Sequence, residues 1–217
     1  MTLLKSDHEP LLAAIDVSRE TLERLDIYAK LLRQWQARIN LVSSSTLDDL
    51  WRRHMVDSAQ AFLVKPEFNS WLDIGSGAGF PGLVVALLRA QTEVPAKMML
   101  VESVGKKCMF MRTVIRETGL SSTPVNVQVL NGRIEEHVPA MSHVDVVSAR
   151  ALASLHDLLT MAEAPITNGA TGLFFKGERY DEEIAEASKT WKFSCTHHAS
   201  VVQAGSTLLE VSDLGRR

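Results

Sequence analysis

The sequence predicts an α/β fold with a mostly parallel sheet, preceded by a helical N-terminal extension. After residue 66, short apolar stretches of strand length alternate with helical patterns, which is typical of a parallel sheet covered on both faces. Residues 71–82 read Trp-Leu-Asp-Ile-Gly-Ser-Gly-Ala-Gly-Phe-Pro-Gly, so an apolar strand runs directly into a Gly-rich turn and a helix. We therefore expect two parts, a helical extension over residues 1–65 and a ligand-binding α/β domain over residues 66–217.

The composition is that of an ordinary globular protein. The chain has 217 residues, 46% hydrophobic content and a formal net charge of −3, so its bulk charge does not predict a nucleic-acid binder. Its two cysteines give no disulfide framework, and no Cys or His shows metal-ligand spacing. The start of the chain does not resemble a signal peptide, and no apolar run is long enough to cross a bilayer. We expect a cytoplasmic monomer that binds neither membranes nor metals.

The helical extension is predicted from apolar residues that recur at helical spacing. One helix is expected from an N-cap at Ser18 to a stop at Asn40. A second is expected to open at Thr46, with Asp49 as its capping-box partner, and to continue until Pro66 ends it. The residues before Ser18 are mixed in character, and we expect a loose start there.

The α/β part is predicted element by element from the change between strand and helix periodicity. Strands are expected at 71–74, 98–101, 125–129, 145–148 and 173–175, followed by a closing hairpin of 192–202 and 206–213. Helices are expected at 83–88, 105–118, 154–164 and 178–189, with a turn at Pro165 and Asn168-Gly169. The closing pair of strands fits the mixed sheet of S-adenosylmethionine (SAM) methyltransferases.

Two classes of ligand compete for the Gly-rich stretch. Gly77 to Gly82 matches the G-x-G-x-x-G pattern of dinucleotide sites, with Glu102 at roughly the 20-residue distance of a ribose-binding acid. The fuller pattern Asp73-x-Gly75-x-Gly77-x-Gly79 resembles the first motif of SAM methyltransferases instead. Because Gly75 directly follows the strand, Gly77 comes two residues late for a dinucleotide turn. We therefore favour SAM over NAD.

Charged side chains follow the predicted strands where ligands of α/β proteins bind. Asp73 and Glu102 are acids at strand ends, and Glu102 is expected to accept hydrogen bonds from ribose hydroxyls while contributing little to the core. Cations follow four successive strands, which suggests a polyanion such as RNA at this rim. These cations are Lys106, Lys107, Arg133, Arg150 and Lys176, and the helical part could extend the rim through Arg33, Arg38, Arg52, Arg53 and His54.

Two kinds of methylation are disfavoured by what the sequence lacks. Methyltransferases that act on exocyclic amines carry a Pro-Pro-aromatic motif after the fourth strand, where this chain has Ser148-Ala149-Arg150-Ala151. Enzymes that methylate pyrimidine carbon use a cysteine in a loop. Cys108 instead falls on the apolar face of a predicted helix and Cys195 in a predicted strand, so neither is expected to be a nucleophile.

Several separated motifs resemble one family, the 16S ribosomal RNA guanine-N7 methyltransferases, also called glucose-inhibited division protein B. The most specific are Arg53-His54-Met55-Val56-Asp57-Ser58 and Gly77-Ala-Gly-Phe-Pro-Gly82. Supporting motifs are Asn40-Leu41, Glu102-Ser103-x-x-Lys106-Lys107, Gly132-Arg133-x-Glu135-Glu136, Ser148-Ala-Arg150-Ala and Phe175-Lys176-Gly177. Together these motifs span residues 40–177 in order.

The resemblance implies a Rossmann-like SAM-dependent methyltransferase fold with a mostly parallel seven-stranded sheet. It also implies methylation of guanine N7 at position 527 of 16S ribosomal RNA, on naked RNA or in the small ribosomal subunit. Family SAM contacts match Gly75, Phe80, Ile134, Glu135 and Arg150, although the family more often has Ala where this chain has Ile134. We add Asp73, Gly77, Gly79 and Glu102 to this SAM set.

The resemblance leaves the reaction pocket and two alternatives to be tested. Arg150 and Lys176 are expected as reaction-pocket residues, with Phe80 beside them, and Arg53, His54, Lys106, Lys107 and Arg133 as RNA contacts. Guanine N7 carries a lone pair and no proton, so the lack of a general base is expected. The alternatives are an NAD-dependent oxidoreductase and a non-catalytic RNA-binding module.

Overall fold

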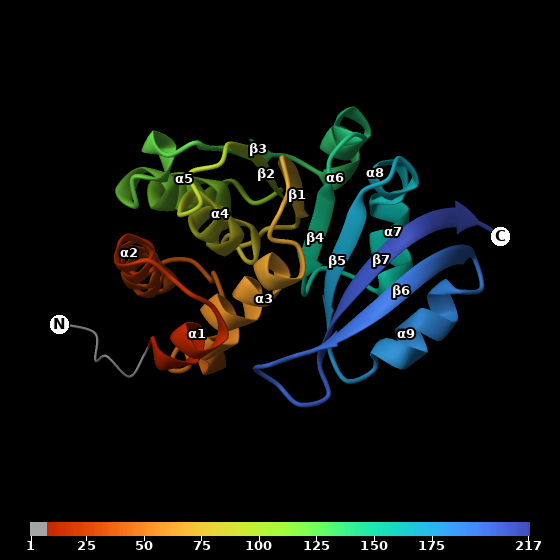
Figure 1. The fold of residues 1–217 in the computed structure, drawn as a ribbon, viewed down its shortest axis with the longest axis horizontal. Coiled ribbons are helices and arrows are strands. Elements are labelled where there is room, and N and C mark those ends of the chain that lie inside the picture. The colour runs from red at the N-terminus through yellow and green to blue at the C-terminus, as the bar shows by residue number, and fades with distance from the viewer. Residues whose placement is uncertain (1–7) are drawn as a thin grey trace.

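A seven-stranded sheet forms the centre of the molecule in the computed structural model, which describes residues 8–217 (Figure 1). The strand order is β3-β2-β1-β4-β5-β7-β6. Strands β1 to β5 are parallel to one another, and β7 is antiparallel to both β5 and β6. The strands are β1 (Ser70–Ile74), β2 (Ala96–Glu102), β3 (Val125–Asn131), β4 (Val146–Arg150), β5 (Thr171–Lys176), β6 (Trp191–Ala199) and β7 (Thr207–Arg216). All strands predicted from the sequence, including the closing hairpin, are present.

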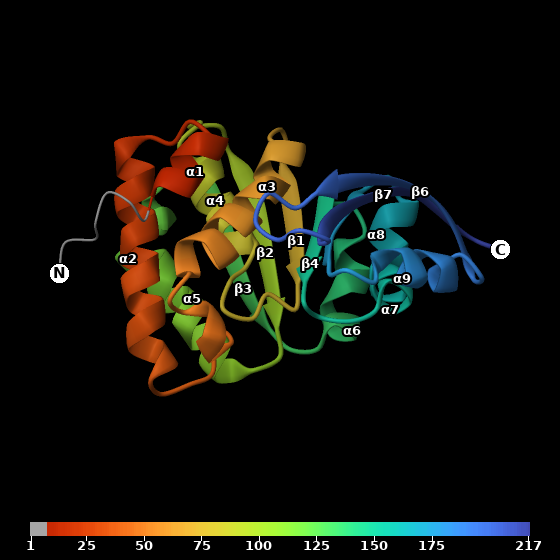
Figure 2. The same ribbon diagram turned by 90° about the horizontal axis from the view of Figure 1, so that it is seen from below.

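Helices cover both faces of the sheet (Figure 2). The helices are α1 (Glu9–Ala14), α2 (Arg19–Gln36), α3 (Asp57–Val64), α4 (Gly82–Ala90), α5 (Gly105–Glu117), α6 (Ile134–His137), α7 (Leu155–Met161), α8 (Glu163–Thr167) and α9 (Tyr180–Ala187). Helices α4 and α5 pack on β1–β3, and α2 packs on the outside of both. Helices α7, α8 and α9 pack together on the opposite face.

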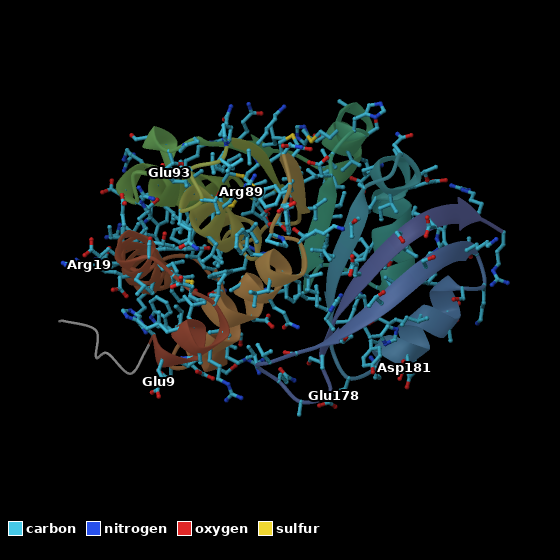
Figure 3. The ribbon with its side chains drawn as sticks, in the orientation of Figure 1. Glu9, Arg19, Arg89, Glu93, Glu178 and Asp181 are labelled. Carbon is cyan, nitrogen blue, oxygen red and sulfur yellow. The ribbon has the colours of Figure 1, made fainter. Side chains whose placement is uncertain are left out.

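Alternating strand residues belong to two separate cores. Trp71 of β1 joins the core beneath α4 and α5, while its neighbour Leu72 joins the core beneath α7 and α8. Because successive side chains of a strand point to opposite faces, a strand covered on both sides is apolar throughout. Charged side chains such as Glu9, Arg19 and Asp181 lie at the outer surface instead (Figure 3).

The helical extension differs from its prediction in three places. A short helix, α1, replaces the expected loose start and buries Leu11 completely. Helix α2 begins after Ser18, whose hydroxyl accepts a hydrogen bond from the Thr21 N–H, as predicted, but it ends at Gln36. The prediction of a single helix from Thr46 to Pro66 is wrong. A 3-10 turn at Ser44–Thr46 and a π-helical turn at Trp51–Val56 come before α3.

Local side-chain contacts explain the broken helix. The Thr46 hydroxyl donates a hydrogen bond to the Ser43 carbonyl at 2.8 Å, so it does not cap a helix at its own position. The expected turn is confirmed at Asn168-Gly169, where Gly169 has φ +101°, but its Pro165 part is wrong, because this proline lies inside α8. A short helical turn, α6, follows β3 where none was predicted.

The helical extension is not packed as a separate unit. Buried side chains of α2 and α3, such as Leu25 and Phe62, belong to the same core as Leu87 of α4. The sequence boundary at residue 65 therefore marks a change in pattern rather than a gap in packing.

Candidate functional site

A cavity of about 770 Å³ lies beyond the carboxyl ends of the parallel strands, the place where open α/β sheets bind ligands. Its wall combines segments that lie far apart in the sequence. The lining includes residues 41–43, 46, 53, 54, 57 and 60 of the helical part, residues 75–78 and 80, residues 101–104 and 107, residues 132–135, residues 150–152, residues 175–177, residues 200, 202, 203 and 206 between β6 and β7, and residues 207 and 208 at the start of β7.

Residues 75–81, here called the Gly-rich turn, join β1 to α4 and form one wall of the cavity. Gly75 and Gly77 have φ values of +65° and +57°, which only glycine adopts without strain. A Cβ on Gly75 would lie 2.6 Å from the Leu152 side chain. Gly75 and Gly77 line the cavity, whereas Gly79 is buried on the side of Tyr28 and Leu83 and does not.

Asp73 lies beneath the Gly-rich turn rather than in the cavity. Its carboxylate is fully buried and accepts hydrogen bonds from the Ser148 hydroxyl at 2.6 Å and from the Gly82 N–H at 3.3 Å. Burial raises its pKa to about 6. Since this carboxylate occupies an N–H at the start of α4, that helix end is not open to a pyrophosphate, which argues against the dinucleotide alternative.

Glu102 lines the cavity at the end of β2. One carboxylate oxygen accepts a hydrogen bond from the Gly77 N–H at 2.9 Å, and the other accepts from the Val104 N–H at 2.8 Å. The side chain is only 7% exposed, so Glu102 is not a solvated acid in a turn. A carboxylate oxygen has two lone pairs, so each can still accept a hydrogen bond from a hydroxyl group of a ligand.

Arg150 is held at the end of β4 by the helical extension. One guanidinium nitrogen donates to the Asp57 carboxylate at 3.0 Å and to the Arg53 carbonyl at 3.1 Å, and the other donates to His54 Nδ1 at 2.6 Å. Its Cζ atom lies 5.0 Å from the centre of the Phe80 ring, a cation–π distance. The guanidinium at the end of β4 therefore contacts both α3, through Asp57, and the Gly-rich turn, through Phe80.

His54 is held as a neutral imidazole of one tautomer. Because a guanidinium can only donate, His54 Nδ1 accepts from Arg150, and its Nε2–H donates to the Thr46 hydroxyl at 2.8 Å. Burial, followed by the charge of Arg150, lowers the pKa of His54 to about 3. His54 is 8% exposed and carries no charge near neutrality, so it is not a free cation for a phosphate.

The Phe80 ring both packs in the core and lines the cavity. It stacks on the Tyr28 ring at 5.2 Å between centroids and on the His54 ring at 4.9 Å. Phe80 therefore contributes both to core packing and to the cavity wall.

The predicted cations divide into paired and unpaired groups. Lys176 is buried, and its ammonium donates to the Glu183 carboxylate at 2.7 Å and to the Ala153 carbonyl at 2.6 Å. Arg53 donates to the Gln203 side chain at 2.6 Å. Lys107 and Arg133 line the cavity, and within residues 8–217 neither forms an ion pair.

The remaining predicted site residues lie at different distances from the cavity. Ile134 and Glu135, at the start of α6, form part of its wall. Lys106 does not reach it and lines a separate hollow between α2 and α5. Cys108 is buried and Cys195 lies in β6; burial raises the pKa of both thiols, that of Cys195 to about 11. Neither cysteine lines the cavity.

The sequence prediction missed several cavity residues, among them Asp57, Gln60 and Gln203. Asp57 lay inside the quoted motif of residues 53–58, which is the signal that could have found it. Gln60 and Gln203 carried no such signal, because packing from distant elements brings them to the cavity.

In the part of the chain that the structure describes, no three His, Cys, Asp or Glu side chains are grouped to hold a metal ion. No helix in that part is long and apolar enough to span a membrane.

Comparison with known proteins gives concordant matches. A family model described as rRNA small subunit methyltransferase G matches residues 21–210. The protein named ribosomal RNA small subunit methyltransferase G from Ruegeria sp. (strain TM1040) is 43% identical over 202 residues, covering 93% of this chain and 95% of the relative. The protein of the same name from Brucella canis is 46% identical over 201 residues, covering 93% and 92%.

Solved structures share the fold at low sequence identity. An O-methyltransferase from Bacillus cereus in complex with SAH has a TM-score of 0.58 at 14% identity, over 98% of this chain and 99% of that one. The O-methyltransferase TomG from Streptomyces achromogenes in complex with SAM has a TM-score of 0.58 at 12% identity, over 95% and 96%. The predicted Rossmann-like methyltransferase fold is confirmed.

Proposed function

The chain belongs to the family of ribosomal RNA small subunit methyltransferase G, and we propose from this premise that it transfers the methyl group of SAM to N7 of a guanine in 16S ribosomal RNA. The observation that carries the proposal is the pair formed by Glu102 and the Gly77 N–H in the wall of the cavity. It brings an acceptor for ribose hydroxyls together with a turn whose backbone a ligand can approach closely.

The residues present fit SAM. Glu102 would hold the ribose hydroxyls, and Gly75 and Gly77 would leave room for the rest of the nucleoside and the amino-acid part. Ile134 and Glu135 would flank the adenine from the start of α6. Asp73 would act from below by fixing the Gly-rich turn, and Gly79 by allowing Tyr28 and Leu83 to pack against that turn.

The chemistry needs orientation rather than a base. SAM supplies an electrophilic methyl group, and guanine N7 attacks with a lone pair that carries no proton. The protein must therefore align the base and exclude water, which proximity and orientation can largely supply. Arg150 would form the boundary between the cofactor and the base, together with Phe80. Lys176 would act as a positioning residue, since its ammonium is engaged by Glu183 and the Ala153 carbonyl.

The RNA would approach over α5 and the rim of the cavity. Lys107 and Arg133 line the cavity and would contact phosphates beside the target base. Lys106 shares a second hollow with Trp35, Arg38 and Met109, which offers cations and apolar surface to the flanking nucleotides. Arg53 and His54 would support the site through Gln203 and Arg150 rather than as free cations.

We further propose that the enzyme works in the cytoplasm as a monomer, with residues 66–217 binding SAM and residues 1–65 completing the base pocket. The family premise supports the location, because the small ribosomal subunit is assembled in the cytoplasm. The two free thiols, Cys108 and Cys195, are consistent with a reducing compartment. Sedimentation at micromolar concentration tests the oligomeric state.

A single assay tests the reaction and its alternatives. The enzyme is incubated with 16S ribosomal RNA or with small subunits and radiolabelled SAM, and the product is reduced with borohydride and cleaved with aniline, which breaks RNA at N7-methylguanine. We expect cleavage at one guanine, and a transfer rate nearly flat from about pH 6 to 9 because no base titrates. Label on a cytosine carbon or an exocyclic amine would contradict the proposal.

Calorimetry separates the other two candidate functions. NAD binding without SAM binding would favour the oxidoreductase, and RNA binding without SAM binding would favour the non-catalytic module. As a control for the chemistry, Cys108→Ala combined with Cys195→Ser should keep transfer intact, since neither thiol lines the cavity.

A further inference from the structure

Part of the cavity wall lies outside the residues assigned to SAM. This part comes from the helical extension and from the loop between β6 and β7. The motif of residues 53–58 lies in this part, as a π-helical turn that leads into α3. Such turns are frequent at functional sites. Asp57 and Gln60 are three residues apart on α3, so they share one helix face, and both line the cavity.

Asp57 offers an acceptor that is partly buried. Its Oδ2 accepts the hydrogen bond from Arg150, whereas Oδ1 has no hydrogen-bond partner within residues 8–217. The side chain is 20% exposed. Burial raises the pKa of Asp57 and the Arg150 charge opposes that rise. The carboxylate is therefore fixed by one oxygen and free to bind a donor with the other.

Gln60 offers a second acceptor whose orientation is fixed. Its amide nitrogen donates to the Ala199 carbonyl at 2.8 Å and lies 3.5 Å from the His198 carbonyl. Rotating the amide would place its oxygen against these two carbonyl oxygens, so the orientation with nitrogen toward β6 is favoured. The Gln60 side-chain oxygen is buried and has no partner in the described chain. An unpaired buried acceptor is energetically unfavourable, and a donor from a ligand would offset this cost.

On the basis of the proposed function, we propose that Asp57 and Gln60 read the Watson–Crick edge of the target guanine. Guanine presents two neighbouring donors on this edge, the N1–H and the 2-amino group, and would direct them to Asp57 Oδ1 and the Gln60 oxygen. The N7 atom lies on the opposite side of the purine and stays free for the methyl group. Adenine also has an N7, but its N1 is an acceptor and would face the carboxylate unpaired. The two side chains thereby select guanine.

Chemically altered RNA tests this assignment. The target guanine is replaced by inosine, which lacks only the 2-amino group, or by adenine, and single-turnover transfer at saturating SAM is measured. For the unaltered enzyme we expect inosine to lower the rate by about 10- to 100-fold, since the Gln60 oxygen loses its donor. Gln60→Leu should lower the rate on guanine by a similar factor and change the rate on inosine little. Asp57→Asn should lower the rate on guanine and reduce the preference for guanine over adenine.

Matched control variants separate a specific role of Asp57 and Gln60 from general damage to the protein. Asp48→Asn and Gln128→Leu make the same chemical changes at exposed positions and should leave both rates and the base preference unchanged. SAM affinity of each variant is measured by calorimetry to detect general damage. Equal losses on guanine and inosine, with an unchanged base preference, would show that both residues only support the fold.

The experiment also separates this inference from the proposed function. If the unaltered enzyme methylates no guanine at N7, the proposed function fails. If it methylates guanine and inosine at the same rate, the proposed function stands and the role of Gln60 is refuted, even where Gln60→Leu does not fold.

Discussion

The Tyr28 hydroxyl of α2 donates a hydrogen bond to the Ala78 carbonyl of the Gly-rich turn at 2.6 Å. Tyr28 is fully buried, and burial raises the pKa of its hydroxyl well above its ordinary value. A helix from the N-terminal extension thus fixes part of the backbone that forms the wall of the cavity.

Tyr28→Phe tests this link. The ring packing against Phe80 is kept, while the Ala78 carbonyl loses its donor in a buried position. We expect the free energy of unfolding to fall by about 1–3 kcal/mol and SAM affinity to fall with it. Urea unfolding and calorimetry measure the two effects. Tyr180, the other tyrosine of the chain, makes Tyr180→Phe the matched control; equal effects in both variants would refute the link.

Glu102→Gln tests the acid at the end of β2. The strand-end position alone predicts weaker SAM binding with unchanged stability. The structure predicts both losses, because an amide cannot accept from the Gly77 and Val104 N–H groups with both of its polar atoms. We expect SAM binding to weaken by about 1–3 kcal/mol and the melting temperature without ligand to fall. Glu67→Gln, at an exposed position, is the control, and an unchanged melting temperature would favour the prediction from sequence.

Asp73 predicts a dependence of stability on pH. Burial raises its pKa in the folded state from 3.8 to about 6, so its contribution to stability is full below about pH 4 and is lost as pH rises through 6. Relative to Asp73→Asn, which cannot ionise, the protein should lose about 2 kcal/mol of stability between pH 4 and 6. Denaturant unfolding of both proteins across this range gives the difference. If the stability difference between the two proteins does not change with pH, the raised pKa of the buried Asp73 is contradicted.

Lys106→Ala combined with Lys107→Ala tests the path of the RNA. Both lysines lie in the first turn of α5, where Lys107 lines the cavity and Lys106 lines the second hollow. Loss of phosphate contacts should weaken RNA binding, flatten its dependence on salt and leave SAM affinity unchanged. Filter binding at several salt concentrations measures the slope. Lys97→Ala combined with Lys192→Ala removes the same charge at the opposite edge of the sheet, and a slope equal to that of this control would argue against phosphate contact.

The regular part of the fold followed from local pattern. Helices cover both faces of strands such as β1 and β2, so these strands are apolar on both faces. The resulting apolar runs can be recognised in the sequence. The start of α2 was predicted correctly, since the Ser18 cap is a contact between residues three apart. The break between Thr46 and α3 was not, because it depends on hydrogen bonds of Thr46 with Ser43 and with His54.

By itself the sequence determined that Gly75, Gly77 and Glu102 meet at one end of a parallel sheet, because strand ends and the first turn of the following helix are local features. Only the tertiary structure decided which charges are free. Lys176 and Arg150 carry the same formal charge as Lys107, but Glu183 and Asp57 neutralise them. The partners of Lys176 and Arg150 lie on other elements. These pairs form only through packing, so no pattern in the sequence predicts them.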